Sequence, residues 1–321
     1  MAVATNSFTT FSAIGNREDL VDTIYNISPV DTPFLAAIGK SKATAVLHEW
    51  QTDALAAAAT NAQLEGDDSQ TAGYSFAAVT PTARLSNRCQ ISRKDVVVSG
   101  TQDVVQKAGR SSEVVYQMLK RAKELKRDIE FTLSSNQQPT AGTVNSARQL
   151  RPLCGWYSTN VFRTAGGANG TATTAATDGS TMRNLSESLV KTALQACWVA
   201  GGNPDLILSG PFNKTVISGF TGNNTRFQDT SDGKISSAID IYESDFGIHK
   251  VAASRFSRDR DLHILTTDMW AVAYLRPMQT LDMAKTGDNE KGQIIAEYTL
   301  EARNEAASAI IADLVSAVTG S

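Results

Sequence analysis

One stretch of 25 residues, 111–135 (SSEVVYQMLKRAKELKRDIEFTLSS), constrains the fold of this chain most strongly. Its apolar residues recur at steps of three and four, which places them on one side of a helix. Ser111 or Ser112 can cap the start, and Asn136 with Pro139 ends the run. A helix of this length spans about 40 Å. Because only this segment has the period, we expect a helix that crosses a whole domain, not a coiled coil. The apolar stripe consists of Val115, Met118, Ala122, Leu125, Ile129 and Leu133.

The chain carries little net charge, but the charge is unevenly distributed. The 321 residues have a formal net charge of −3. From Arg84 to Glu130 there are eleven basic and six acidic residues, a net charge of +5 that leaves −8 for the rest. A solvated helix face with charged loops explains this excess better than a nucleic-acid-binding patch. The protein as a whole is not built to coat nucleic acid.

The cysteines and the N-terminus indicate synthesis in a cytoplasm. Cys89, Cys154 and Cys197 lie far apart without CxxC spacing, which is typical of reduced, partly buried thiols and not of a disulfide framework or zinc site. The N-terminus has neither a basic region nor an apolar core of the kind found in signal peptides. No apolar run approaches the length needed to span a membrane, so we expect no membrane partner.

Two segments near the N-terminus have too little core of their own. Residues 1–16 are uncharged, and the apolar residues Phe8, Phe11 and Ile14 are spaced by three, as if one edge lay on a neighbouring subunit. Residues 44–52 and 74–98 look extended and flank a small, polar stretch. This pattern predicts a long hairpin arm with a mobile tip. A two-stranded hairpin is marginally stable in water, so the arm must lie on its own body or on another subunit.

The second half of the chain predicts a compact α/β unit followed by more strands. Residues 184–276 alternate between helical and extended patterns, with Asn184 and Glu187 as a capping-box-like start. Residues 278–292 are predicted to form a charged loop. The segment IIAEYTLEARN (294–304) alternates in the manner of a strand, and AASAIIADL (306–314) is predicted to be the adjacent strand, both packed against the long helix.

Motifs for catalysis are missing. The three histidines, His48, His249 and His263, form no HExxH or HxH pattern and no Cys/His cluster. There is no GxSxG, P-loop or GxGxxG motif after a strand. The carboxylates of RDRD (258–261) are interpreted as partners in salt bridges across a subunit contact. We therefore expect no catalytic site, no metal, no cofactor and no enzyme activity.

Eight short segments, spread in one order over almost the whole chain, resemble the major capsid proteins of tailed double-stranded-DNA bacteriophages. The resemblance is to the podovirus-type branch of the HK97-like fold family. The segments are ISPVDTPFLAAIGK (27–40), HEWQTDAL (48–55), VSGTQDVV (98–105), ELKRDIE (124–130), GGNPDLIL (201–208), YESDFG (242–247), AKTGD (284–288) and EYTLEARNEAASAIIADL (297–314).

The resemblance implies an α+β fold with named parts. It implies a subunit that forms hexamers and pentamers of a closed icosahedral shell around packaged double-stranded DNA. The parts are an N-terminal arm (1–43), an extended β-hairpin loop (44–92), a peripheral domain (93–183 and 277–321) with a spine helix (111–135), and an axial domain (184–276).

The resemblance also implies partners and a location. Besides copies of the chain itself, we expect a portal protein at one vertex and leave room for a decoration or cement protein. The chain begins almost directly with the arm, which predicts a separate scaffolding protein. The protein is expected in the virion, after assembly in the host bacterial cytoplasm. No Lys–Asn crosslink is expected.

Residues predicted at subunit interfaces combine charge or aromatic character with a place in the arm, the hairpin or a charged loop. A second, smaller set on the long helix is predicted to face the lumen. The interface set is Phe8, Phe11, Ile14, His48, Trp50, Arg84, Arg88, Arg93, Lys94, Arg258, Asp259, Lys285, Asp288, Glu290 and Lys291. The lumen set is Lys120, Lys123 and Arg127.

Three other functions remain as alternatives. An encapsulin-type shell protein of a cellular compartment has the same fold and would recruit an enzyme cargo. An α/β hydrolase built on residues 184–276 would need a pocket with perturbed titratable groups. A tail or head decoration protein is disfavoured by the chain's length and by the long helix beside a hairpin arm.

Overall fold

The long helix α3 runs from Glu113 to Ser134 in the computed structural model, which describes residues 31–60, 62, 65, 79, 81–220 and 240–316. The predicted range is therefore confirmed to within two residues at either end. Ser112 caps the helix by accepting a hydrogen bond from the main-chain N–H of Val115 at 3.4 Å. The predicted residues Phe8, Phe11 and Ile14 lie outside the described residues.

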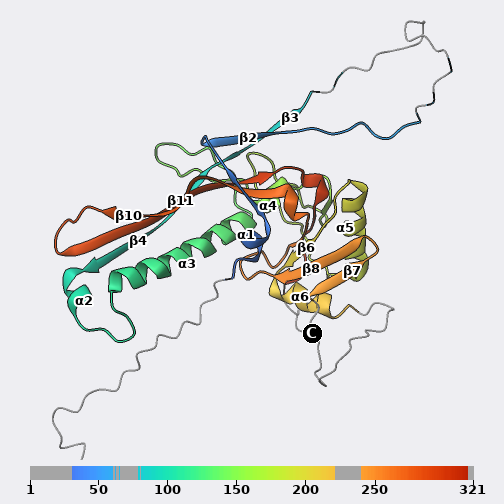
Figure 1. Cartoon of the computed structure of the whole chain (residues 1–321). Helices are drawn as coiled ribbons and strands as arrows, with labels where there is room; N and C mark the ends of the chain where they lie inside the picture. The colour runs from blue at the N-terminus through green and yellow to red at the C-terminus, as the bar shows by residue number, and fades with distance from the viewer. Residues whose placement is uncertain are drawn as a thin grey trace, which may run out of the picture.

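The apolar stripe of α3 is buried only along its C-terminal half. Leu125, Ile129 and Leu133 are buried in the core, as the pattern predicted. Val115, by contrast, is 58% exposed, because the first turns of α3 extend beyond the core. Figure 1 shows this part of α3 running under a sheet that projects from the main body.

A four-stranded sheet lies against α3 and has the strand order β1-β10-β11-β4. Strand β1 (Gly39–Lys42) is parallel to β10 (Trp270–Met283), while β11 (Asn289–Ala302) is antiparallel to both β10 and β4 (Gln90–Ser99). Most of the predicted charged loop, 278–292, is therefore strand, and only the turn between β10 and β11 is loop. The exposed strands carry charged side chains, which made their sequence look like a loop.

A six-stranded sheet has the order β5-β12-β9-β6-β8-β7. Helices α5 (Glu187–Val199) and α6 (Pro211–Ser218) accompany it, as Figure 1 shows. The N-cap of α5 is Ser186, whose side chain accepts a hydrogen bond from the main-chain N–H of Leu189. The predicted cap, Asn184, lies two residues earlier. The strands are β5 (Val161–Phe162), β12 (Ala309–Ile311), β9 (Leu262–Leu265), β6 (Leu206–Ser209), β8 (Gly247–Ala253) and β7 (Ile241–Ser244).

Strand β12 belongs to this second sheet and not beside β11, where the sequence pattern placed it. A short 3-10 helix, Glu305–Ala307, turns the chain away from β11. The Glu305 carboxylate accepts hydrogen bonds from Ser158, and the main-chain N–H of Ile310 donates to Asn160 at 3.1 Å. All three residues of β12 are buried, which an interior position between β5 and β9 provides.

The two sheets share one core. Leu125 and Leu133 of α3 join the same buried cluster as Tyr298 from the four-stranded sheet and Leu208 from the six-stranded sheet. Strand β10 begins next to the six-stranded sheet, where the indole N–H of Trp270 donates to Ser308 at 2.9 Å. The boundary predicted between residues 276 and 277 falls within β10. The remaining short helices are α1 (Pro33–Ala37), α2 (Gly100–Val104), α4 (Leu153–Trp156) and a 3-10 helix, Thr267–Met269.

Asp313 fastens the loop 163–181 to the end of the chain. Its backbone has φ +61°, a conformation that alanine adopts at a cost but that Asn and Asp tolerate. Its carboxylate accepts main-chain hydrogen bonds from Thr164 (3.0 Å) and Gly179 (2.7 Å), and Arg260 lies 3.3 Å away. Burial raises the pKa of Asp313, but these hydrogen bonds outweigh it and leave the pKa below its usual value.

We expect Asp313→Ala to lower the free energy of unfolding by about 2 kcal/mol, since it leaves two partly buried N–H groups without acceptors. Asp313→Asn keeps one oxygen acceptor and the backbone preference, so its loss should be smaller. Because the folded-state pKa is depressed, the contribution of Asp313 is present above the unfolded-state pKa and is lost as the pH falls through the folded-state value. Calorimetry of unassembled subunits measures both effects. Equal losses in the two variants would contradict this account.

Candidate assembly surfaces

A two-stranded hairpin projects from the body of the molecule. Strand β2 (Leu47–Thr52) pairs with β3 (Ala83–Arg88) in antiparallel register, from Leu47 opposite Arg88 to Thr52 opposite Ala83. No third strand joins them among the described residues. The eight residues that follow β2, 53–60, are all exposed. Figure 1 shows the hairpin leading away from both larger sheets, so the predicted hairpin is confirmed at its base.

The base of the hairpin is tied to the body by side chains that the sequence assigned to subunit contacts. The indole N–H of Trp50 donates to the main-chain oxygen of Ala302 at 2.9 Å, and its ring lies 5.5 Å from that of Trp156. Nε2 of His48 lies 3.3 Å from a carboxylate oxygen of Glu301. Both side chains are thus partnered within the chain, and they orient the hairpin.

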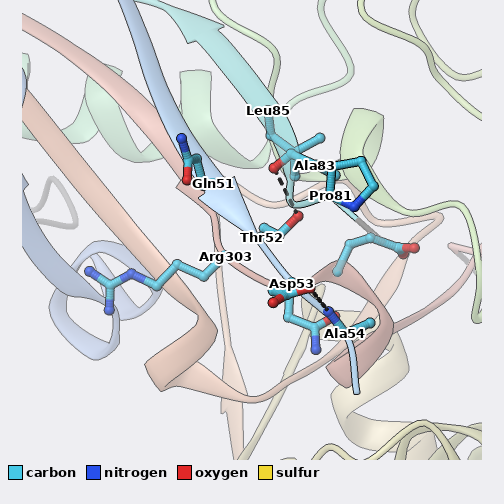
Figure 2. Close-up of a pocket in the computed structure, with 10 residues that line it drawn as sticks. Gln51, Thr52, Asp53, Ala54, Pro81, Ala83, Leu85 and Arg303 are labelled. Atoms are coloured by element: carbon cyan, nitrogen blue, oxygen red, sulfur yellow. Dashed lines mark hydrogen bonds between the residues drawn. The ribbon is translucent and has the colours of Figure 1, made fainter. Parts of the chain in front are cut away.

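A cavity of about 560 Å³ opens between the hairpin and the loop that follows β11. Figure 2 shows Gln51, Thr52 and Pro81 on the hairpin side of this cavity and Arg303 on the other side. The cavity is open to solvent in the part of the chain that the structure describes. Its lining residues form no arrangement of catalytic groups. Its full lining is Gln51, Thr52, Asp53, Ala54, Pro81, Ala83, Leu85, Arg303, Asn304 and Glu305.

The outer part of the four-stranded sheet has an open face on the side opposite α3. Along β4, Val96 and Val98 are buried towards the helix, so Val97 points the other way. In register with Val97 are Lys291 and then Met283. This open face carries apolar side chains that are between 40% and 63% exposed, which marks a contact surface when they are contiguous. These are Ile91, Val97, Leu281 and Met283.

Sequence reasoning missed the open face because it concentrated on charged residues. The signal was available in VVVS (96–99), where alternating burial in a strand leaves one valine in three outside. A second groove, of about 510 Å³, lies between the start of α3 and the turn of the β10–β11 hairpin. Val115 and Leu119 of α3 are exposed and line it together with Thr280 and Asp282 of β10.

The charged residues predicted at interfaces take several different positions. Arg84 forms an ion pair with Glu49 along the hairpin. Arg93 lies on the open face, 3.8 Å from Asp95, whereas Lys94 points towards the helix and lies 2.7 Å from Asp128. The side chain of Arg88, at the end of β3, is half-buried.

The turn of the β10–β11 hairpin and the first residues of β11 hold four more of the predicted interface residues. Lys285 lies 3.0 Å from Glu290, and Lys291 donates to the hydroxyl of Thr286. Asp288 is exposed, and its main-chain oxygen accepts from the N–H of Gly100. The turn is therefore a charged, exposed projection next to the start of α3.

The charge of Arg258 is neutralised within the chain, whereas two residues of the lumen set are exposed. The guanidinium of Arg258 pairs within the chain with Asp178 (2.7 Å) and Asp261 (2.9 Å). The main-chain oxygen of Asp259 accepts from Asn213. Lys120 and Lys123 of α3 are exposed, whereas the guanidinium of Arg127 lies over the ring of Phe256 at 5.5 Å.

Solved structures with a similar fold come from virus capsids and related particles. The capsid of a native GTA particle aligns with a TM-score of 0.64 at 12% identity, over 95% of this chain and 98% of that chain. The capsid of cyanophage A-1(L) aligns with a TM-score of 0.63 at 14% identity, again over 95% and 98%. The fold is thus the α+β, HK97-like fold, and it places the chain in the class of capsid shell folds.

Residues 3–315 match the family described as SU10 major capsid protein, and the chain belongs to that family. The major capsid protein of Escherichia phage Phieco32 is 26% identical over 343 aligned residues, which cover 95% of this chain and 96% of that protein. The chain is therefore a structural subunit of a phage capsid and not an enzyme. In the part of the chain that the structure describes, no helix is long and apolar enough to cross a membrane.

Proposed function

We propose that this subunit forms hexamers and pentamers, which close into an icosahedral head around double-stranded DNA. The observation that carries the proposal is the two-stranded hairpin β2–β3, which has no third strand among the described residues. The open face of β4, β10 and β11 is a second incomplete surface. Both would gain burial from neighbouring copies, and several modest contacts repeated by symmetry suffice to close a shell.

The proposed parts of the subunit follow the predicted division with one change. Residues 1–43 serve as an arm and 44–92 as an extended loop. The four-stranded sheet with α3 forms the peripheral domain, and the six-stranded sheet forms the axial domain. The change concerns β5 and β12. Strand β12 pairs with β9 on one side and with β5 on the other, which supports an axial domain drawn from three parts of the chain.

The proposed partners are a portal protein at one vertex, a separate scaffolding protein and packaged DNA bound without sequence specificity. Assembly takes place in the host bacterial cytoplasm. A decoration protein has a parallel in the solved capsid of phage G, which contains decoration proteins with the major capsid proteins. The exposed Lys120 and Lys123 support a lumenal position for this face of α3, since phosphate contacts require exposed cations. The family match favours a phage head over an encapsulin.

Electron microscopy of the expressed protein tests the proposal. We expect closed shells or capsomers, with shells more uniform when the phage's scaffolding protein is co-expressed. A subunit that stays a monomer at every concentration, with and without that scaffold, would overturn it. Copurification of an enzyme cargo would instead favour the encapsulin.

Charge reversal at Arg88 and Arg93 should weaken the contacts between subunits. Arg93 is exposed on the open face, and Arg88 is half-buried at the end of β3. We expect the double variant Arg88→Glu, Arg93→Glu to yield fewer shells and to release subunits at lower salt, because exposed ion pairs are screened by salt. Reversal at Arg121, which pairs with Glu124 on α3, is the control. Unchanged shell yield and salt stability in the double variant would contradict an interface role.

A further inference from the structure

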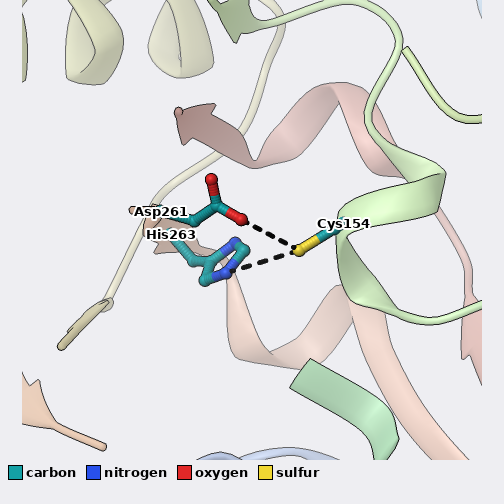
Figure 3. Close-up of side chains that lie close together, drawn as sticks. All are labelled: Cys154, Asp261 and His263. Atoms are coloured by element: carbon teal, nitrogen blue, oxygen red, sulfur yellow. Dashed lines mark hydrogen bonds between the residues drawn. The ribbon is translucent and has the colours of Figure 1, made fainter. Parts of the chain in front are cut away.

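Three metal-ligating side chains meet in the interior of the molecule, far apart in the sequence. Cys154 lies in α4, Asp261 precedes β9, and His263 lies in β9. All three are completely buried. Figure 3 shows the carboxylate and the imidazole both directed at the sulfur. Sγ of Cys154 lies 3.4 Å from Oδ2 of Asp261 and 4.0 Å from Nε2 of His263.

These separations are close to those of a tetrahedral zinc site. Zn–S bonds of about 2.3 Å and Zn–N or Zn–O bonds of about 2.0–2.1 Å place neighbouring ligand atoms about 3.3–3.6 Å apart. One ligand atom from each of the three residues lies within 4.8 Å of the other two. The distance from Sγ to Oδ2 fits this range, and Nε2 must move a few tenths of an ångström closer to Sγ to fit it.

The polar atoms in this cluster are incompletely used by the protein. Oδ1 of Asp261 and Nδ1 of His263 are buried and have no hydrogen-bond partner among the described residues. Buried polar atoms without partners are uncommon, so the cluster is polar and incompletely satisfied. These two are not the atoms nearest the sulfur, and the ligand set therefore rests on Oδ2 of Asp261 and Nε2 of His263. Arg258 donates to Oδ2 of Asp261 at 2.9 Å, and a hydrogen-bonded carboxylate of this kind is usual around bound metals.

The charge of Arg258 does not exclude a cation at this place. Its guanidinium is shared with Asp178, which accepts two hydrogen bonds at 2.9 and 2.7 Å. A thiolate and a carboxylate supply the two negative charges that balance a divalent ion, while the guanidinium of Arg163 is a second positive charge that acts on Asp261 and His263. Without an ion, the thiol of Cys154 donates to Asp261, and the cluster is a small buried hydrogen-bond network.

We propose that Cys154, Asp261 and His263 bind a zinc ion that fastens α4 to the six-stranded sheet. Thiolate and imidazole ligands select zinc over magnesium or calcium, which prefer oxygen alone. A fourth donor is needed, and the main-chain oxygen of Ser134 lies 3.8 Å from Sγ. Binding displaces the thiol proton, which leaves to solvent, so no oxidant or reductant takes part.

Metal content of the purified protein tests the proposal directly. After dialysis against a weak chelator, elemental analysis should find about one zinc ion per chain. Protein from bacteria grown with Co²⁺ should show the intense visible bands of tetrahedral cobalt and a sulfur-to-cobalt charge-transfer band. Because this spectrum is recorded on the unaltered protein, it does not depend on whether any variant folds.

Two variants assign the ion to the cluster. Cys154→Ala should lose the charge-transfer band and most of the zinc, whereas Cys197→Ala, which removes a buried thiol outside the cluster, should keep both. Asp261→Asn should weaken retention of the ion during dialysis. A protein with well under one zinc per chain and no cobalt spectrum would overturn the proposal in favour of the hydrogen-bond network. A cobalt spectrum without the sulfur band, or one lost equally in Cys197→Ala, would overturn it too.

Discussion

Replacing Glu130 by alanine should lower the free energy of unfolding by about 3–5 kcal/mol, a loss otherwise seen for large core truncations. Glu130 is completely buried in α3, and its two carboxylate oxygens accept the main-chain N–H groups of Phe34 (2.9 Å) and Leu35 (2.7 Å). These are the first N–H groups of α1, which have no partner within that helix. Alanine would leave both of them buried and unpaired.

Loss of the Glu130 carboxylate should loosen α1 in addition to lowering the stability of the whole subunit. Phe34 and Leu35 are buried in the main core together with residues of α3, so α1 is held against α3. Amide hydrogen exchange at these two residues should rise in the alanine variant before the rest of the core is affected. Burial raises the pKa of Glu130 and outweighs the two N–H groups, which lower it. The neutral amide of Glu130→Gln should therefore cost less than alanine.

Glu124→Ala provides a matched control on the same helix. Glu124 pairs with Arg121 across one turn on a partly exposed surface, and such pairs contribute about 0.5 kcal/mol or less. Urea unfolding of the unassembled subunit measures all three variants. If Glu130→Ala cost no more than Glu124→Ala, the carboxylate would not be what holds α1 in place.

The sequence predicted those elements whose pattern is decided locally. The period of the apolar residues defined α3, and the extended segments around residue 50 and before residue 90 indicated the β2–β3 hairpin. The β10–β11 hairpin was harder, because its outer strands bury one face only and carry the charges of a loop. The placement of β12 could not follow from AII alone, since three buried residues fit an interior position in either sheet.

Candidate site residues were less predictable, because a polar side chain's partner depends on contacts far along the chain. His48 meets Glu301, 253 residues later, and the carbonyl that Trp50 binds is equally remote. The cluster of Cys154 and Asp261 joins residues separated by 107 positions, which no spacing motif describes. An exposed apolar residue such as Val97 is informative about a contact surface where others lie on the same face, since apolar residues scattered singly are normal on protein surfaces.

Shortening the β2–β3 hairpin should abolish closed shells while leaving the subunit folded. Replacing residues 53–82 by Asn-Gly joins Thr52 to Ala83, which are already paired, through the two-residue turn that suits such a hairpin. The anchors of the hairpin base, Trp50 and Asn87, remain in place. Stability should change little, because the described residues of the removed segment are all exposed, and the hydrogen bond that Thr82 donates to Gln51 is an exposed one.

Assembly should fail because the removed segment supplies contact area that a single chain cannot use. A standard pairwise interface buries about 1,600 Å² in total, and loss of a long arm removes a large share of that area from each contact. Sedimentation velocity and electron microscopy at matched concentrations should show subunits or small capsomers in place of shells. Ala57→Ser with Ala58→Ser keeps the length of the arm and should still assemble. If the shortened chain formed shells at the unaltered yield, the hairpin would not be needed for contacts between subunits. The open face of β4, β10 and β11 would then be the surface that carries assembly.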